Sequence, residues 1–284
     1  SDDLAVLLLA MPRFNTINLD FLDGFEAAMA AIDSEEGLKG IVLTSAHADF
    51  CVGADLNMIL ASGDVNQVHE MTLRFHQVHR RMENGLPIVC ALPGSALGGG
   101  YELALACHHI VAVDSPKLQV GLPEVMLGLI PGGGGTQRLP RLIELPKALD
   151  MILTGKSVDA KKAVKIGLAD AIIPHRHLDK AAQDFIAACN SDYVKQIKKK
   201  RQAKHSSKQE LMHPIICHMA KKQILKKGGA VYPAPLVALD LIRRTRYKSL
   251  EKGLEEEIKS FTKLVGTPLS KTLIHIFFGM ENLK

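Results

Sequence analysis

The sequence lacks the cysteine patterns that cross-link small secreted proteins or bind zinc. Its five cysteines are scattered, are odd in number and include no C-x-x-C pair. We therefore expect neither a disulfide framework nor a zinc ribbon. The run Cys107-His108-His109 also lacks the spacing of metal ligands, so we expect it to be structural and expect no metal site. Reduced thiols suit the cytoplasm of a bacterium, or a peroxisome or mitochondrial matrix if the chain is eukaryotic.

Long apolar runs are absent as well. No stretch approaches the roughly 18 uncharged residues that a membrane span needs, and the chain starts with the acidic sequence Ser1-Asp2-Asp3, which is unlike a signal peptide. With 284 residues, of which 47% are hydrophobic and 23% charged, the composition is typical of a soluble protein with a substantial core. We predict one large domain, or one domain with an appendage, that is neither secreted nor embedded in a membrane.

Phosphate-binding loops are missing, although two glycine-rich segments, 94–106 and 121–139, dominate the sequence. Neither segment is followed by Gly-Lys-Ser/Thr, and no G-x-G-x-x-G spacing exists in the chain. Ser95 is not a nucleophile elbow, because Pro93 stands where that motif requires glycine. Nucleotide hydrolysis, dinucleotide binding and serine hydrolysis are therefore disfavoured.

Short apolar runs alternate with helical patterns in the first half of the sequence, as they do in βα units. After Pro174 the strand pattern nearly vanishes, and the sequence becomes helical and rich in lysine. We predict an α/β fold with buried strands at 4–10, 41–44, 88–92 and 110–113, helices at 19–32 and 65–83, and C-terminal helices at 235–248, 249–264 and 268–279. The last helix is apolar, so we expect it to fold back on the core of its own chain.

Charge is unevenly distributed between the two parts of the chain. Residues 1–175 carry 13 Lys and Arg against 20 Asp and Glu, whereas residues 176–284 carry 22 against 10. A basic segment attracts phosphates in general, so nucleic-acid binding is one interpretation. A solvated helix face, or a docking surface for a polyanionic small ligand or a neighbouring domain, is the interpretation that we favour, also for the run 198–201.

The first glycine-rich segment places free backbone N–H groups next to a carboxylate. Gly98-Gly99-Gly100 follows the predicted strand 88–92 and opens a helix near Gly99, with Glu102 in its first turn. Donors at a helix N-terminus that a carbonyl can approach closely are what an oxyanion hole requires. Alternatively, the glycines only allow close packing of the helix, and Glu102 only interacts with the helix dipole.

A second glutamate favours the catalytic interpretation. Glu124 lies in the apolar context Leu122-Pro123-Glu124-Val125 and precedes a second glycine run that opens a helix at 134–142. A carboxyl in apolar surroundings has a raised pKa and stays protonated, which suits a general acid. If both carboxyls line one cavity, they either divide the acid and base roles or share a proton.

These blocks resemble the crotonase (enoyl-CoA hydratase/isomerase) superfamily, and more narrowly the N-terminal hydratase part of multifunctional β-oxidation enzymes such as the α-subunits of fatty-acid oxidation complexes. The strongest matches are Gly53-Ala54-Asp55-Leu56, the segment 96–100 and the segment 122–139. The resemblance implies a crotonase-like ββα spiral core in residues 1–175, a helical segment 176–227 that completes the hydratase domain, and a helical linker 228–284 toward a 3-hydroxyacyl-CoA dehydrogenase domain.

The resemblance also implies a role for individual residues. The backbone N–H groups of Ala54 and Gly99 would form the oxyanion hole, and that of Gly132 would hold the attacking water. Glu102 would deprotonate this water, and Glu124 would protonate the α-carbon. The further residues expected to contact the substrate are Asp55, Leu56 and Gly98. Asn57 departs from the family, since hydratases often have lysine there beside the nucleotide part of the ligand.

The implied activity is hydration of trans-2-enoyl-CoA to 3-hydroxyacyl-CoA in fatty-acid β-oxidation, with Δ3/Δ2-enoyl-CoA isomerisation as a second reaction. Acyl-CoA is then the substrate and no cofactor is expected, because NAD requires the dehydrogenase domain. That domain and a thiolase β-subunit are the implied partners. The alternative is a catalytically silent crotonase-fold module that binds a protein partner or RNA through its basic C-terminal helices. A silent module, however, has no need for two carboxylates in apolar surroundings.

Overall fold

The main sheet is five-stranded and wholly parallel. The computed structural model describes residues 3–61, 65–189, 207–226, 228 and 231–281. The strand order is β1 (Leu4–Leu9), β2 (Gly40–Ser45), β3 (Ile88–Leu92), β5 (His109–Val113) and β8 (Ala171–Ile173). Every residue of β3 and β5 is buried, as expected of central parallel strands that are covered on both faces. The predicted α/β core is thereby confirmed.

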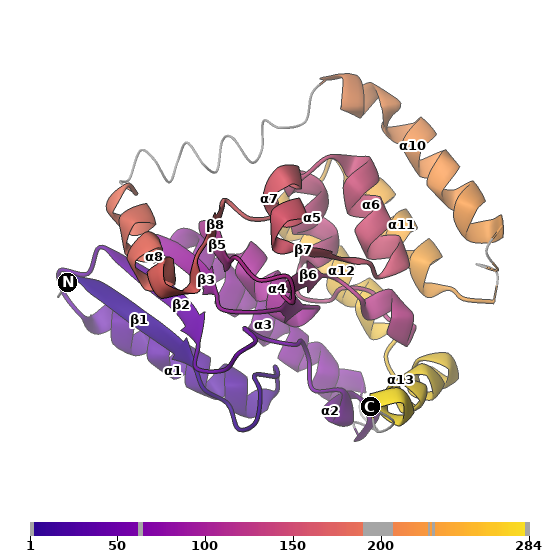
Figure 1. Cartoon of the computed structure of the whole chain (residues 1–284). Coiled ribbons are helices and arrows are strands. Elements are labelled where there is room, and N and C mark those ends of the chain that lie inside the picture. The colour runs from indigo at the N-terminus through magenta and orange to yellow at the C-terminus, as the bar shows by residue number, and fades with distance from the viewer. Residues whose placement is uncertain (1–2, 62–64, 190–206, 227, 229–230, 282–284) are drawn as a thin grey trace.

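Helices cover both faces of this sheet (Figure 1). Alternate residues of a strand point to opposite faces, so Leu43 of β2 packs into the core cluster that holds α1 (Leu19–Ser34) and α3 (Val65–Asn84). Its neighbour Val42 packs with α8 (Leu178–Ala187) on the other side. The predicted helices 19–32 and 65–83 are therefore confirmed, with small differences at their ends.

The prediction that the first strand is buried is wrong for its outer face. The side chains of Val6 and Leu8 are 63% and 52% exposed. The reason is topological, because β1 is the edge strand of the sheet and α8 packs mainly over β2, β3 and β5. An apolar run alone does not distinguish an edge strand from a central one.

A second, smaller sheet stands beside the main one. It consists of β4 (Ala96–Leu97), β6 (Gln119–Gly121) and β7 (Ser157–Asp159). Isolated bridges join Cys51 to Ala96 and Ile17 to Ala54, so the loop after β2 runs along this layer. The layer ends directly before α4 (Gly99–Leu105), and it therefore determines where the first glycine-rich segment lies.

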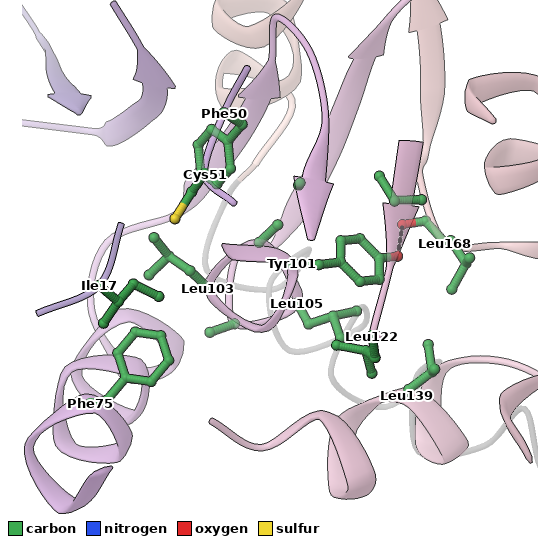
Figure 2. Packing of buried hydrophobic residues seen from close by; sticks show 14 of the residues in the cluster. Ile17, Phe50, Cys51, Phe75, Tyr101, Leu103, Leu105, Leu122, Leu139 and Leu168 are labelled. Atoms are coloured by element: carbon green, nitrogen blue, oxygen red, sulfur yellow. Dashed lines mark hydrogen bonds between the residues drawn. The ribbon is translucent and has the colours of Figure 1, made fainter. Parts of the chain in front are cut away.

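Helix α4 is buried along its whole length at the centre of the molecule. Figure 2 shows Tyr101, Leu103 and Leu105 of this helix surrounded by apolar side chains from several elements. The Tyr101 hydroxyl donates a hydrogen bond of 3.0 Å to the carbonyl oxygen of Leu168, which satisfies the one polar atom of this side chain inside the core. The helix is consequently a rigid platform for Glu102.

After Pro174 the described part of the chain is helical, as predicted. The remaining helical elements are α2 (Leu56–Ala61), η1 (Glu124–Leu127), α5 (Gly135–Leu142), α6 (Leu145–Thr154), α7 (Ala160–Ile166), η2 (His175–His177), α10 (Ser207–Lys226), α11 (Ala234–Thr245), α12 (Leu250–Thr262) and α13 (Pro268–Glu281). Helix α12 packs against α3, α5 and α11, and α13 packs against η1 and α2.

The last helix folds back on its own chain, as predicted. Ser270 and Ile274 of α13 are fully buried, and Leu273 lies against Gly128 at the end of η1. Across the described part of the chain, no helix combines the length and apolar character that crossing a bilayer requires. The basic run 198–201 lies outside the described residues.

Candidate active site

The backbone N–H groups of Ala54 and Gly99 lie close together where the small sheet meets α4. The N–H of Ile17 donates to the carbonyl of Gly53 at 2.9 Å, and the N–H of Asp55 donates to the carbonyl of Ile17 at 3.0 Å. In such a parallel bridge the bonds come from the neighbours of Ala54, so its own N–H points away from Ile17. It points toward the start of α4, because a methyl group on Gly99 would lie 3.7 Å from the Ala54 nitrogen.

Glycine is required on both sides of this pair of donors. Gly53 and Gly98 have φ angles of +103° and +54°, which side chains rarely adopt. A Cβ atom on Gly53 would stand 3.5 Å from the Gly99 nitrogen, and one on Gly99 would stand 2.9 Å from Cδ1 of Ile17. Within the described chain, neither the Ala54 nor the Gly99 N–H donates to another residue. The two donors therefore converge as an oxyanion hole requires.

Glu102 lies in the first turn of α4 and is almost completely buried. Its Oε1 accepts hydrogen bonds from the N–H groups of Gly133 at 2.8 Å and Gly135 at 2.6 Å. Burial raises the pKa of Glu102 to about 7, while these two N–H groups and the charge of Arg138 act in the opposite direction. The carboxyl is thus poised to change its protonation state near neutral pH.

Glu124, the first residue of η1, has a different environment. Both of its carboxyl oxygens are buried, and neither is hydrogen-bonded to any other described residue. A Cβ atom on Gly98 would lie 3.1 Å from its Oε1, which places this carboxyl beside the residue that precedes Gly99. Burial raises the pKa of Glu124 well above its usual value, and the charges of Glu102 and Glu257 raise it further. The protonated form is therefore favoured at neutral pH.

Gly132 is held by contacts that only glycine permits. A Cβ atom there would lie 2.8 Å from the ring of Phe261, a side chain of α12. The Gly132 carbonyl accepts a hydrogen bond of 2.6 Å from Nε2 of His76, and the next carbonyl, of Gly133, accepts one of 2.9 Å from Nδ1 of His79. Burial, assisted by the positive charge of Arg138, lowers the pKa of His76 to about 4, so this ring is neutral.

Two other predicted substrate contacts lie at the start of α2. Asp55 accepts a hydrogen bond of 2.9 Å from the N–H of Asn57, which is the geometry of a helix cap. Leu56 is half-buried against the core. The structure thus brings Ala54, Gly98, Gly99, Glu102, Glu124 and Gly132 into one region, while the observed contacts of Asp55 are those of a capping residue. The catalytic and binding roles of all these residues stay predictions.

Glu257 on α12 was not predicted from the sequence. This side chain is completely buried, and its two oxygens accept hydrogen bonds from the N–H groups of Gly134 at 2.5 Å and Thr136 at 2.9 Å. The Thr136 hydroxyl donates to it as well. The signal available in the sequence was helical spacing, because residue 257 lies between Leu254 and Phe261 on the apolar face of the helix.

Arg138 is a buried cation close to these carboxyls, and the sequence analysis did not single it out. Its Nε donates to Oε1 of Glu83 at 2.8 Å, and its Nη1 donates to the carbonyl of Gly133 at 3.0 Å.

No group of three or more His, Cys, Asp or Glu side chains among the described residues is placed to hold a metal ion. In the predicted structural run 107–109, Nδ1 of His108 accepts a hydrogen bond of 3.0 Å from the backbone of Ile88.

The family match and the similar known proteins agree with one another. The family described as Enoyl-CoA hydratase/isomerase matches residues 1–227. The protein "Fatty acid oxidation complex subunit alpha" of Shewanella amazonensis is 41% identical over 287 residues, which cover 100% of this chain and 40% of that protein. Its counterpart in Shewanella loihica is 40% identical, covering 99% of this chain and 40% of the relative. The chain thus spans about two fifths of the length of these relatives.

Solved structures resemble the whole chain. The enoyl-CoA hydratase of Bacillus anthracis is 26% identical with a TM-score of 0.61, and the match covers 98% of this chain and 93% of that one. Human mitochondrial delta3-delta2-enoyl-CoA isomerase is 18% identical with a TM-score of 0.72, covering 99% and 94%. At that identity the second likeness shows a shared fold alone.

Proposed function

The chain belongs to the enoyl-CoA hydratase/isomerase family and has the α/β crotonase fold, and from this premise we propose that it hydrates trans-2-enoyl-CoA to 3-hydroxyacyl-CoA. One observation carries the proposal. The buried carboxyls of Glu102 and Glu124 lie next to the backbone N–H groups of Ala54 and Gly99. Glu102 accepts hydrogen bonds from two backbone N–H groups, whereas Glu124 accepts none from another described residue.

The pair of donors is suited to a thioester. The N–H groups of Ala54 and Gly99 bind the carbonyl oxygen and stabilise the negative charge that develops on it when water adds to the β-carbon. The position of Gly99 at the N-terminus of α4 adds the favourable end of the helix dipole. The β-carbon thereby becomes electrophilic.

The unlike environments of the two carboxyls support one division of the acid and base roles. Hydrogen bonds from N–H groups favour the ionised form of a carboxyl, so Glu102 accepts the proton of the attacking water, whose oxygen forms the new bond to the β-carbon. Glu124, which is favoured in its protonated form, donates its proton to the α-carbon. Turnover leaves Glu102 protonated and Glu124 ionised, and passage of one proton back between these neighbours restores the starting state. Water is thus added without any cofactor.

Three further roles belong to the proposal. The N–H of Gly132 holds the attacking water, supported by the contact with Phe261 and by the hydrogen bond from His76 to its carbonyl. Gly98 and the Asp55-Leu56 pair at the start of α2 contact the bound acyl-CoA. The same cavity isomerises Δ3-enoyl-CoA to Δ2-enoyl-CoA, because that reaction needs one carboxyl to move a proton between two carbons of an enolate.

The greater length of the relatives supports a larger assembly. We place residues 1–175 and 176–227 in the hydratase domain and 228–284 in a linker toward a 3-hydroxyacyl-CoA dehydrogenase domain, which would bind NAD. A thiolase β-subunit is the proposed partner, since the relatives are subunits of fatty acid oxidation complexes by name. Because these relatives are bacterial, we propose a cytoplasmic location.

Crotonyl-CoA tests the proposal against a catalytically silent module. The wild-type chain is expected to remove the absorbance of the conjugated enoyl thioester, and a Glu102→Gln/Glu124→Gln double variant is expected to leave it unchanged. Circular dichroism of both proteins checks that the variant is folded. Equal rates for the two folded proteins would refute the hydratase function and leave the binding module as the better account.

A further inference from the structure

The segment 133–136 is held from two sides by carboxyl groups of different helices. The N–H groups of Gly133 and Gly135 donate to Glu102 of α4. Those of Gly134 and Thr136 donate to Glu257 of α12. Four successive N–H groups thus alternate between two acceptors whose residues are 155 positions apart in the sequence, and each carboxyl fixes the peptide groups that the other does not.

This segment needs such anchors more than an ordinary loop does. It includes the end of the run Gly132–Gly135, and glycine loses more conformational freedom on folding than any other residue. Gly134 has a φ of +104°. Without an acceptor on the side of α12, the N–H groups of Gly134 and Thr136 would be buried and unpaired, and the segment would gain alternative conformations.

The approach of α12 that brings Glu257 to this segment is also closely fitted. Gly253 lies one helical turn before Glu257, and a Cβ atom there would collide with the side-chain amide of Gln137 on α5. One further turn along, Phe261 contacts Gly132. Three positions at successive turns of α12 therefore touch α5 or the glycine run that precedes it.

We propose that Glu257 is a positioning residue, which fixes the segment 133–136 so that the N–H groups of Gly133 and Gly135 hold Glu102 in the orientation and basicity that its reaction requires. This inference rests on the proposed hydratase function. It makes the C-terminal helical segment a part of the active site, since the segment supplies a group without which the catalytic base is misplaced.

The charged and titratable groups around Glu257 come from four elements. They are Glu102 of α4, Glu124 of η1, His76 of α3, whose Nε2 lies 3.7 Å from Oε1, and Arg138 and Arg141 of α5. Burial and the charge of Glu102 raise the pKa of Glu257 to about 8, although the hydrogen bonds from Thr136 and Gly134 and the charge of Arg138 act in the opposite direction. The protonated form therefore predominates at pH 7, and glutamine at this position mimics its charge.

The test compares Glu257→Gln with Glu255→Gln, which makes the same change at an exposed position of the same helix. Glutamine presents an amide NH2 where one carboxyl oxygen accepted an N–H, so the segment loosens while the charge near pH 7 hardly changes.

We expect kcat for crotonyl-CoA to fall between about tenfold and about a hundredfold in Glu257→Gln, with KM changed less than about twofold. The rising limb of the pH–rate profile should move to higher pH, because Glu102 loses donors that favour its ionised form. Glu255→Gln should match the wild type.

The outcomes separate this inference from the proposed function. No turnover by the wild type would contradict the hydratase function itself. Wild-type turnover together with an unchanged kcat and pH profile in folded Glu257→Gln would overturn the positioning role. A shift of the limb to lower pH would overturn it too, because that direction is expected if Glu257 acts on Glu102 as a neighbouring charge. If Glu257→Gln does not fold, Thr136→Val takes its place. This change removes the hydroxyl that donates to Glu257 and accepts from Gln137, and it must show the same shifts in smaller measure. Wild-type behaviour of Thr136→Val would overturn the inference.

Discussion

Glu102 and Glu257 share one backbone segment, since Glu102 accepts the N–H groups of Gly133 and Gly135 and Glu257 accepts those of Gly134 and Thr136. Neither carboxyl is exposed. The segment 133–136 is thereby fixed by two acids from different helices, and the acid that we propose as the catalytic base depends on a helix near the end of the chain.

The oxyanion hole is tested most simply by Gly99→Ala. The added methyl group would lie 2.9 Å from Cδ1 of Ile17 and 3.7 Å from the Ala54 nitrogen, so it would crowd the two proposed donors. We expect kcat for crotonyl-CoA to fall by a factor of about 10² to 10³. Steady-state kinetics measure this, and thermal unfolding checks that the fold is kept.

Gly24→Ala is the matched control for Gly99→Ala. Gly24 lies within α1, and a Cβ atom there would meet no heavy atom within 4 Å. This variant should keep wild-type kinetics and gain about 0.5 to 1 kcal/mol of stability, because alanine favours a helix interior. Equal activities of the two variants would exclude an oxyanion hole at Gly99.

The buried carboxyls predict that stability falls as pH rises. Burial raises the folded-state pKa of Glu102 to about 7 and of Glu257 to about 8, and that of Glu124 lies well above its usual value. An acid whose pKa is raised by folding binds more protons in the folded state, so its contribution is complete below the unfolded pKa and is lost as pH rises toward the folded one. Urea unfolding should give a smaller free energy of unfolding at pH 8 than at pH 6, by about 1 kcal/mol or more.

Glu124→Gln should reduce this loss of stability between pH 6 and pH 8, since it removes one of the three titrating groups. Glu255→Gln, at an exposed site, should leave the loss unchanged. A free energy of unfolding that rises over this range in the wild type would contradict the protonated state that we assign to these carboxyls.

The contact between Gly132 and Phe261 predicts a cost in packing. A methyl group on Gly132 would lie 2.8 Å from the ring, so Gly132→Ala should destabilise the fold by about 1 to 3 kcal/mol. Phe261→Ala removes Cγ, Cδ1 and Cδ2, the ring atoms nearest to this methyl group, and should recover part of the loss when it is combined with Gly132→Ala. Denaturant unfolding of the two single variants and the double variant measures the coupling. Strictly additive effects would show that the two positions do not press on each other.

Much of the main sheet and of the helical C-terminal part could be predicted from the sequence. Apolar runs such as 88–92 and breaks such as Gly266-Thr267-Pro268 are local signals, and the helix that opens at Gly99 follows from a glycine run after a strand. The two glutamates were found because they adjoin such signals. Each of these features depends on residues that are close together in the sequence.

The features that the sequence did not reveal depend on distant parts of the chain. Strands β4, β6 and β7 have two or three residues each, too few for a periodic pattern, and they exist because they pair with one another. The exposure of Val6 follows from the position of β1 at the sheet edge. The burial of Glu257 follows from the docking of α12 on α5, more than a hundred residues earlier.

In the mechanism that we propose, two buried carboxyls with unlike environments divide the base and acid roles. The pH dependence of kcat/KM for crotonyl-CoA tests this division. We predict a limb that rises through about pH 7 as Glu102 ionises, and a limb that falls at higher pH as Glu124 loses its proton. The residual activity of Glu102→Gln should lack the rising limb, and that of Glu124→Gln should lack the falling one. A profile that keeps both limbs in both single variants, or that falls between pH 6 and pH 8 in the wild type, would contradict the account.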